Sequence, residues 1–216
     1  MTTDETTRLI EALAAKAQPV QRLRPPALRA ALWLSAVGAL IALAIWLFSD
    51  LTLSLQRLQD VRLDWEMASM LLTGILAVIA AFHLSLPDRS VAWALLPLPT
   101  LGLWLASMGY NCYRHWFIDG WALGSSWDCL KFIVGVSVPL GVSLFYLLHR
   151  AAPLAPMRVA AMGGLGVASI AAFALQFFHP FDVTFLDLGT QVIAVGLVVL
   201  VTSVYERMSS ARAARR

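Results

Sequence analysis

The chain has 216 residues, of which 59% are hydrophobic and 13% charged, and its formal net charge is +3. Soluble domains have about a quarter of their residues charged and scatter their apolar residues at helix or strand period. Here the apolar residues come in blocks of about 20, the length that a helix needs to cross roughly 30 Å of hydrocarbon. The composition therefore excludes a mainly soluble protein and predicts an all-α, polytopic membrane helical bundle.

Residues 1–28 are expected to form a cytoplasmic N-terminal segment with a short amphipathic helix. Residues 2–5 resemble a capping box, which marks the start of a helix of about four turns. The apolar residues that follow at helical spacing are Leu9, Ile10, Leu13 and Ala17. This stripe suits a helix that lies on the lipid surface beside the basic residues 22–24, or a helix that docks on a cytoplasmic protein.

Six apolar blocks follow, and we expect each to be a transmembrane helix within a domain of residues 29–205. In chain order the blocks are residues 30–48, 67–86, 91–108, 129–148, 157–178 and 188–205. The first block should stay in the mature chain, because it is too long for a signal peptide and lacks an Ala-x-Ala-like cleavage site. Residues 206–216 would then form a basic cytoplasmic tail.

Three prolines lie inside these blocks. Pro97 and Pro99 predict a kink or a broken hydrogen bond in the third helix, and Pro139 lies in the middle of the fourth. Residues 86–90 leave only a tight turn between the second and third helices. We therefore expect the proline-bearing third and fourth helices to be the parts that can bend.

The distribution of Lys and Arg predicts the orientation. Counted with the span ends beside them, the N-terminal segment, the second and fourth loops and the tail together contain twelve of these residues, and the first, third and fifth loops contain the other four. By the positive-inside rule both termini are expected in the cytoplasm of a bacterial inner-membrane, multi-pass protein. The positive net charge is then explained by topology, so no direct nucleic-acid partner is needed.

Charged residues are expected only near the ends of the spans. Asp64 and Glu66 would lie at the start of the second helix, where acidic groups complement the helix dipole. His83, His149 and Arg158 fall near cytoplasmic ends, and Lys131 near an outer end. Transporters coupled to protons or ions usually place such a group at the midplane, so this class is disfavoured.

A small-residue face is predicted in the fifth helix. It consists of Ala160, Gly164, Ala168 and Ala172, which recur at every fourth position. Small residues allow the backbone of another helix to come close, and packing within the bundle is the simplest use of such a face.

Reactive residues gather on the predicted outer side. The two cysteines of the chain, Cys112 and Cys129, lie in the third loop (residues 109–128) and directly after it, and His179 lies in the fifth loop. A disulfide between the cysteines is plausible, and its role as a structural staple or as a redox- or metal-responsive site stays open. The first turn of a helix favours a thiolate at Cys129, whereas a helix C-terminus disfavours one at Cys112.

Several short motifs resemble a known family. They are residues 9–14 (LIEALA), 19–26 (PVQRLRPP), 30–33 (AALW), 84–87 (LSLP) and 93–98 (WALLPL), together with the cysteine at position 129. With this layout, the chain resembles the NrsF-type membrane anti-sigma factors of proteobacteria. These proteins restrain an extracytoplasmic-function sigma factor.

The resemblance implies a mechanism. The cytoplasmic N-terminal segment would hold the sigma factor at the membrane, and outward-facing cysteines would respond to oxidants or heavy metals and release it. The residues that the resemblance assigns to sigma-factor binding are Leu9, Ile10, Leu13, Val20, Arg22 and Arg24. The residue that it assigns to sensing is Cys129. A regulator of this kind is not an enzyme, and it needs no catalytic residue and no cofactor.

One departure from the family pattern concerns the last outer loop. Members often have a second cysteine before a proline there, where this chain has His179 before Pro180. Three outcomes remain open: Cys112 replaces the missing partner, Cys129 and His179 share a metal, or sensing has been lost.

Two other functions fit a small helical bundle. A DsbB-like thiol oxidoreductase relays electrons between two cysteine pairs, and this chain has one pair and no Cys-x-x-Cys. A small neutral-solute transporter or a membrane scaffold would explain the bundle, but it leaves the cysteines and the N-terminal helix without a role.

Overall fold

The structure is a computed structural model. The structure describes residues 6–8, 11–12, 15, 23–49, 61–119, 126–151 and 156–178, with single positions between 193 and 208. Throughout these residues the chain is helical apart from short turns and segment ends, and the described part contains no strand, so the predicted all-α class is confirmed there.

The elements in chain order are α2 (Pro26–Phe48), α4 (Val61–Leu84), the 3-10 helix η1 (Val91–Leu95), α5 (Leu98–Asp119), α6 (Ser126–His149) and α7 (Pro156–Phe178). Within the described residues, five helices are long and apolar enough to cross a membrane. They correspond to the first five predicted spans. The sixth stays a prediction, because only scattered positions from Ile193 to Met208 are described, each of them helical.

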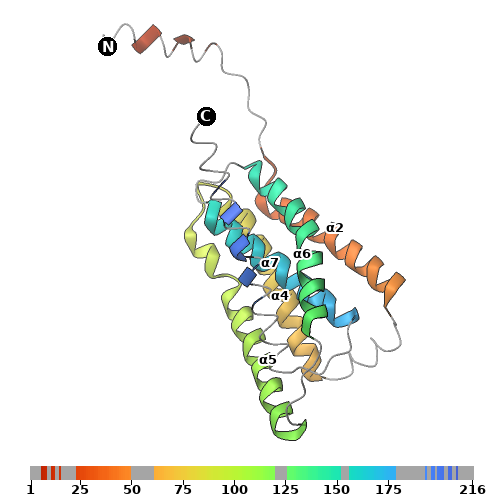
Figure 1. The fold of residues 1–216 in the computed structure, drawn as a ribbon. Coiled ribbons are helices and arrows are strands. Elements are labelled where there is room, and N and C mark those ends of the chain that lie inside the picture. The colour runs from red at the N-terminus through yellow and green to blue at the C-terminus, as the bar shows by residue number, and fades with distance from the viewer. Residues whose placement is uncertain are drawn as a thin grey trace.

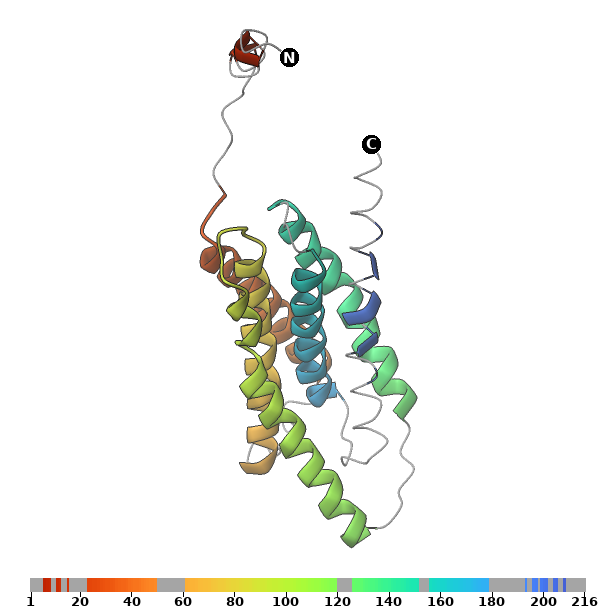
Figure 2. The same ribbon diagram turned by 90° about the vertical axis from the view of Figure 1, so that its left-hand side faces the viewer.

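The five helices run alternately up and down along the bundle (Figures 1 and 2). One end gathers the start of α2, the turn after α4, the end of α6 and the start of α7. We call it the arginine end, after Arg24, Arg29, Arg89, Arg150 and Arg158. The opposite end gathers the end of α2, the start of α4, the end of α5, the start of α6 and the end of α7. We call it the cysteine end, because Cys112 and Cys129 lie on the helices that meet there.

The centre of the bundle is the pair α4 and α7, which make the most extensive helix contact. Two glycines let their backbones approach. A Cβ atom added to Gly74 would lie 3.2 Å from the carbonyl oxygen of Gly166, and one added to Gly166 would lie 3.1 Å from the backbone nitrogen of Val78. Such an approach is available only where no side chain intervenes.

The predicted small-residue face of α7 is buried, as expected. Ala160, Ala168 and Ala172 have no exposed surface, and Gly164 is buried with them. A close backbone approach to α4 is at Gly166, which is not part of that face. The prediction was right about close packing and missed the residue on which the packing depends.

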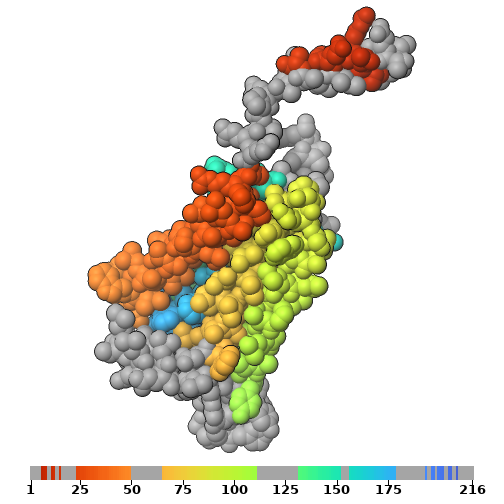
Figure 3. Space-filling model, turned by 180° about the vertical axis from the view of Figure 1, so that it is seen from behind, coloured from red at the N-terminus to blue at the C-terminus, as the bar shows by residue number. Residues whose placement is uncertain are grey.

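Two hydrophobic clusters divide the core along its length. The first contains α2 residues such as Trp33 and Val37 together with Phe82 of α4 and Leu144 of α6. The second consists of Met70, Trp104, Met108, Ile133, Ala171, Ala172 and Leu175, from α4, α5, α6 and α7. Among the described residues, α2 contributes only to the first cluster. Figure 3 shows the consequence: α2 diverges from α4, and α7 is visible between them.

The third predicted span is divided near Pro97, which confirms the expected break. Ser90 begins η1 by accepting a hydrogen bond from the backbone N–H of Ala92. After η1 the chain turns, and the amide of Leu101 donates to the carbonyl oxygen of Pro97 over 2.9 Å as α5 starts. The predicted tight turn before this span is also present, with the amide of Arg89 bonded to the carbonyl oxygen of Leu86.

The prediction that residues 109–128 form a loop is wrong for most of that range. Helix α5 continues to Asp119, and α6 already begins at Ser126. Hydropathy marks where the hydrocarbon ends, whereas a helix can continue into the aqueous phase wherever no proline or competing turn stops it. The same effect moves the start of α4 back to Val61, so Glu66 lies in the second turn of the helix.

Candidate functional site at the root of the N-terminal segment

The residues predicted to bind the sigma factor lie before α2. Arg24 is exposed, two residues before the helix begins. Leu9, Ile10, Leu13, Val20 and Arg22 lie outside the described residues. Their described neighbours Arg8, Glu11, Ala12 and Ala15 are helical and exposed. These four follow the spacing i, i+3, i+4, i+7 and therefore share one face of a helix, apart from the predicted apolar stripe.

Two of the three predicted sensor residues, Cys112 and Cys129, lie toward the cysteine end. Cys112 is in α5 and Cys129 in the first turn of α6, both placed by their backbone, and His179 is outside the described residues. Cys112 is not at a helix C-terminus, since α5 runs on to Asp119. The expectation that a helix C-terminus disfavours a thiolate at Cys112 is therefore wrong. The expectation for Cys129, in the first turn of a helix, is unaffected.

The helix register relates the cysteines to the second core cluster. Cys112 comes one turn after Met108 in α5, and Cys129 comes one turn before Ile133 in α6. Glu66 comes one turn before Met70 in α4 in the same way, and it has no exposed surface. Residues four apart lie on one helix face, so three helices carry Glu66, Cys112 and Cys129 one turn beyond the cluster, toward the cysteine end.

Glu66, which was expected at the start of the second helix, lies in the second turn of α4 and is buried. The sequence signal that would have found it is its spacing from Met70, Thr73 and Ala77, which are buried on the same side of α4. Among the side chains that the structure describes, no three His, Cys, Asp or Glu residues lie together as a metal site would require. The side chains of the two cysteines are outside that set.

Arg29 ties the start of α2 to the end of α6. One guanidinium nitrogen donates to the carbonyl oxygen of Leu147, and the guanidinium carbon lies 5.1 Å from the ring centroid of Phe82. Leu147 is in the last turn of α6, where carbonyl groups lack intrahelical partners and the helix dipole favours a cation. Arg29 therefore acts as a cap for α6 that is supplied from another helix.

Trp33 makes a second bond one turn further along α2. Its indole N–H donates to the hydroxyl of Ser143 over 3.1 Å, and that hydroxyl donates to the carbonyl oxygen of Leu140 over 2.8 Å. Trp33 is buried, with 5% of its surface exposed. We call the set of Arg29, Trp33, Ser143 and Leu147 the α2–α6 bridge.

The bridge joins two helices whose backbones are not closely packed. Helix α2 packs against α4 and, less extensively, against α7, whereas its connection to α6 is made through the long side chains of Arg29 and Trp33. At the cysteine end α2 is held by another bond, in which the hydroxyl of Ser49 donates to the carbonyl oxygen of Phe177 over 2.9 Å. Polar bonds therefore attach α2 near both of its ends.

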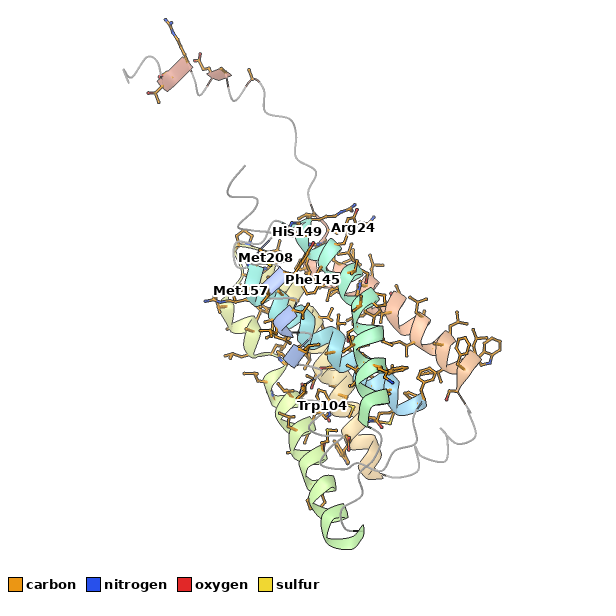
Figure 4. All side chains as sticks on the ribbon, in the orientation of Figure 1. Arg24, Trp104, Phe145, His149, Met157 and Met208 are labelled. Carbon is orange, nitrogen blue, oxygen red and sulfur yellow. The ribbon has the colours of Figure 1, made fainter. Side chains whose placement is uncertain are left out.

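Other contacts order the arginine end around the bridge. The rings of His83 and Trp93 stack at 3.9 Å, which fixes η1 against α4. Arg150 donates to the phenol oxygen of Tyr146 over 2.7 Å within α6. Figure 4 shows Arg24, His149 and Met157 together at this end, with Trp104 further toward the other. Sequence reasoning missed the bridge, although Arg29 and Trp33 stand four residues apart at the start of the first apolar block.

The fold and this site define a polytopic helical membrane protein in which α2 attaches an N-terminal segment to the bundle. Within that class, the model of the NrsF family, described as negative regulator of sigma F, matches residues 13–208. The chain belongs to this family, which confirms the resemblance seen in its motifs. Comparisons with curated proteins and with solved structures found no match.

Family membership makes the protein a negative regulator of a sigma factor, and a sigma factor is its partner. The matched region includes Leu13, Arg24 and both cysteines. It starts after Leu9 and Ile10.

Proposed function

We propose that the protein is an anti-sigma factor of the bacterial inner membrane that holds an extracytoplasmic-function sigma factor through residues 1–24. The observation that carries the proposal is the family match over residues 13–208, which covers the second half of the segment before α2 together with the membrane bundle. Oxidants or heavy metals are the signals, and Cys129 senses them with Cys112 or His179.

Several observations support the N-terminal segment as the docking element. Arg8, Glu11, Ala12 and Ala15 are helical and exposed, so this side of the segment is not covered by the bundle. The predicted apolar stripe of Leu9, Ile10 and Leu13 offers what a helix-in-groove contact requires. Pro25 and Pro26 then separate the segment from the membrane helix, because Pro26 is the first residue of α2.

The arginine end supports a cytoplasmic location for the segment. The exposed residues Arg24, Arg89 and Arg150 come from three parts of the chain and lie at the same end of the bundle. A Lys- and Arg-rich end faces the cytoplasm under the positive-inside rule. With six spans, both termini are on that side.

The sensing half rests on the register of Cys112 and Cys129. Both stand one turn beyond the same core cluster, on α5 and on α6. An oxidant that takes two electrons and two protons from these thiols leaves a disulfide between the two helices. A soft metal ion would instead displace the thiol protons and bind the thiolates, with His179 as a further ligand. Either event adds a bond from α6 to a neighbouring part of the outer side.

The docking proposal is tested by binding. The full-length protein in detergent, a chain without residues 1–24, and the variants Leu13→Asp and Ala12→Asp are each titrated with the purified extracytoplasmic-function sigma factors of the source bacterium. Burying an unpaired carboxylate in an apolar contact should weaken binding by a factor of about 30 or more in Leu13→Asp. Ala12→Asp, on the exposed face, should change it less than about threefold. Equal binding by the truncated chain would rule out this docking role.

The sensing proposal is tested in cells that report sigma-factor activity. Cys129→Ser should abolish induction by oxidants and by cadmium, whereas His179→Ala should affect induction only if a metal is shared. Cys112→Ser distinguishes the pairings, since it abolishes oxidant induction if the partner of Cys129 is Cys112. Normal induction in Cys129→Ser would refute sensing through this residue.

A further inference from the structure

We infer that Arg29 and Trp33 are positioning residues for sigma-factor retention, and that α6 links their state to the cysteine end. The inference rests on the proposed function and adds the route by which a signal reaches the docking segment. Of the described elements, α6 alone both carries a proposed sensor residue, Cys129, and forms side-chain hydrogen bonds with the start of α2.

The distances along α6 suit this role. Ser143 follows Cys129 by roughly 20 Å at 1.5 Å rise per residue. Leu147 follows one turn later. The helix therefore covers most of the thickness of the hydrocarbon between the sensor residue and the bridge. Because no loop interrupts α6, a displacement of the helix at Cys129 also moves Ser143 and Leu147.

The bridge is suited to being broken. Arg29 and Trp33 reach α6 through long side chains, and α2 and α6 lack close backbone packing like that at Gly74 and Gly166. A small shift of the Ser143 hydroxyl from its 3.1 Å distance ends that hydrogen bond, whereas close packing would resist the shift.

A weak point in α6 lies between Cys129 and the bridge. Pro139 is inside the helix and has no N–H to donate to the carbonyl of Gly135. Gly135 has no heavy atom within 4 Å of the position of a Cβ, and both residues are exposed. Helices bend at such positions, so a pull on the first turn of α6 changes the direction of the part that follows Pro139 and contains Ser143 and Leu147.

The far attachment of α2 determines what moves. Ser49 remains bonded to Phe177 of α7, the buried central helix, when the bridge opens. The first cluster still packs Ala30 and Val37 against α4, so the change is confined to the first turn of α2, to which Arg24 and the docking segment are attached. The bridged state in this structure is the retaining state, and opening the bridge releases the sigma factor.

The test measures the sigma factor held in the membrane fraction of unstressed cells. Trp33→Phe and Ser143→Ala remove the Trp33–Ser143 bond and should lower retention at least threefold. Ser143→Thr keeps a hydroxyl and should retain normally. Matched controls are Trp46→Phe, at an exposed position of α2, and Ser35→Ala, whose hydroxyl bonds only within its own helix, to Leu32. Both controls should behave as the unaltered protein.

Two further variants separate a coupling role from a merely structural one. Cys129→Ser combined with Trp33→Phe should still release the sigma factor, because the bridge acts after the sensor. Pro139→Ala should act in the opposite direction, with full retention and a weakened response to oxidants. The control Val138→Ala, at the neighbouring exposed position, should respond normally.

The outcomes are distinguishable. Normal retention by Trp33→Phe and Ser143→Ala, while the chain without residues 1–24 fails to retain, would overturn this inference and leave the proposed function intact. Retention by the truncated chain would overturn the docking role itself. A normal oxidant response in Pro139→Ala would refute bending at this proline as the route.

Discussion

At the scale of single residues, the helix crossing depends on two glycines. A Cβ on Gly74 would come within 2.7 Å of the side chain of Ile170, and one on Gly166 would come within 2.7 Å of the side chain of Val78. Backbone oxygen and nitrogen atoms lie almost as near, so neither site can relax by a rotamer change alone. In a membrane, where burial of apolar surface does not drive helices together, such close packing is a main source of stability.

Gly74→Leu is therefore expected to destabilise the bundle. Overpacking of this kind costs about 1–3 kcal/mol or more, because α4 and α7 must separate. Gly102→Leu on α5 is the matched control, since no heavy atom lies within 4 Å of its Cβ position. It should be neutral or slightly stabilising. The thermal midpoint in detergent checks both, and equal midpoints for the two variants would contradict the packing argument.

The burial of Glu66 also depends on how α4 packs against neighbouring helices. Its sequence position near the start of an apolar block predicted a carboxylate at the start of a helix. Helix α4 instead begins at Val61, and Glu66 is fully buried in its second turn. Its position relative to Met70 places it in register with the two cysteines, which no pattern in the sequence had indicated.

At the scale of elements, the length of α5 changes how the cysteines are viewed. The sequence predicted that the chain from Gly109 to Asp128 is a loop, whereas α5 continues to Asp119. Cys112 therefore belongs to a helix and not to a flexible connection, so a bond from it to Cys129 would join two helices.

Hydrogen exchange tests this point. The amides of residues 113–119 should exchange slowly in the detergent-solubilised protein, because each donates to the carbonyl four residues earlier in a helix. Fast exchange across all seven would support the loop that hydropathy predicts. The amides of Leu103 and Leu105, deep in the same helix, provide the slow reference.

At the scale of the whole molecule, the alternation of five helices predicts which connections share a side. A reporter fused after Phe48 or after Asp119 should lie outside the membrane, and one fused after Ala151 should lie in the cytoplasm, because the arginine end is the cytoplasmic one. A reporter fused after Arg216 decides the sixth span. A cytoplasmic reporter there means six spans with both termini on one side, and an external reporter means five.

The sequence by itself determined that the chain is a helical membrane protein, where its first five spans lie and to which family it belongs. Blocks of about 20 apolar residues leave few alternatives in a bilayer, since a helix satisfies its own backbone hydrogen bonds. The break at Pro97 followed equally directly from the chemistry of proline.

Only the tertiary structure decided which faces of the helices meet. The spans are apolar on nearly all sides, so their sequences carry little amphipathic signal to mark an inner face. The bonds from Arg29 to Leu147 and from Trp33 to Ser143 join residues 118 and 110 positions apart. The Gly74–Gly166 crossing and the α2–α6 bridge therefore depend on how separate helices pack, which no local pattern in the chain encodes.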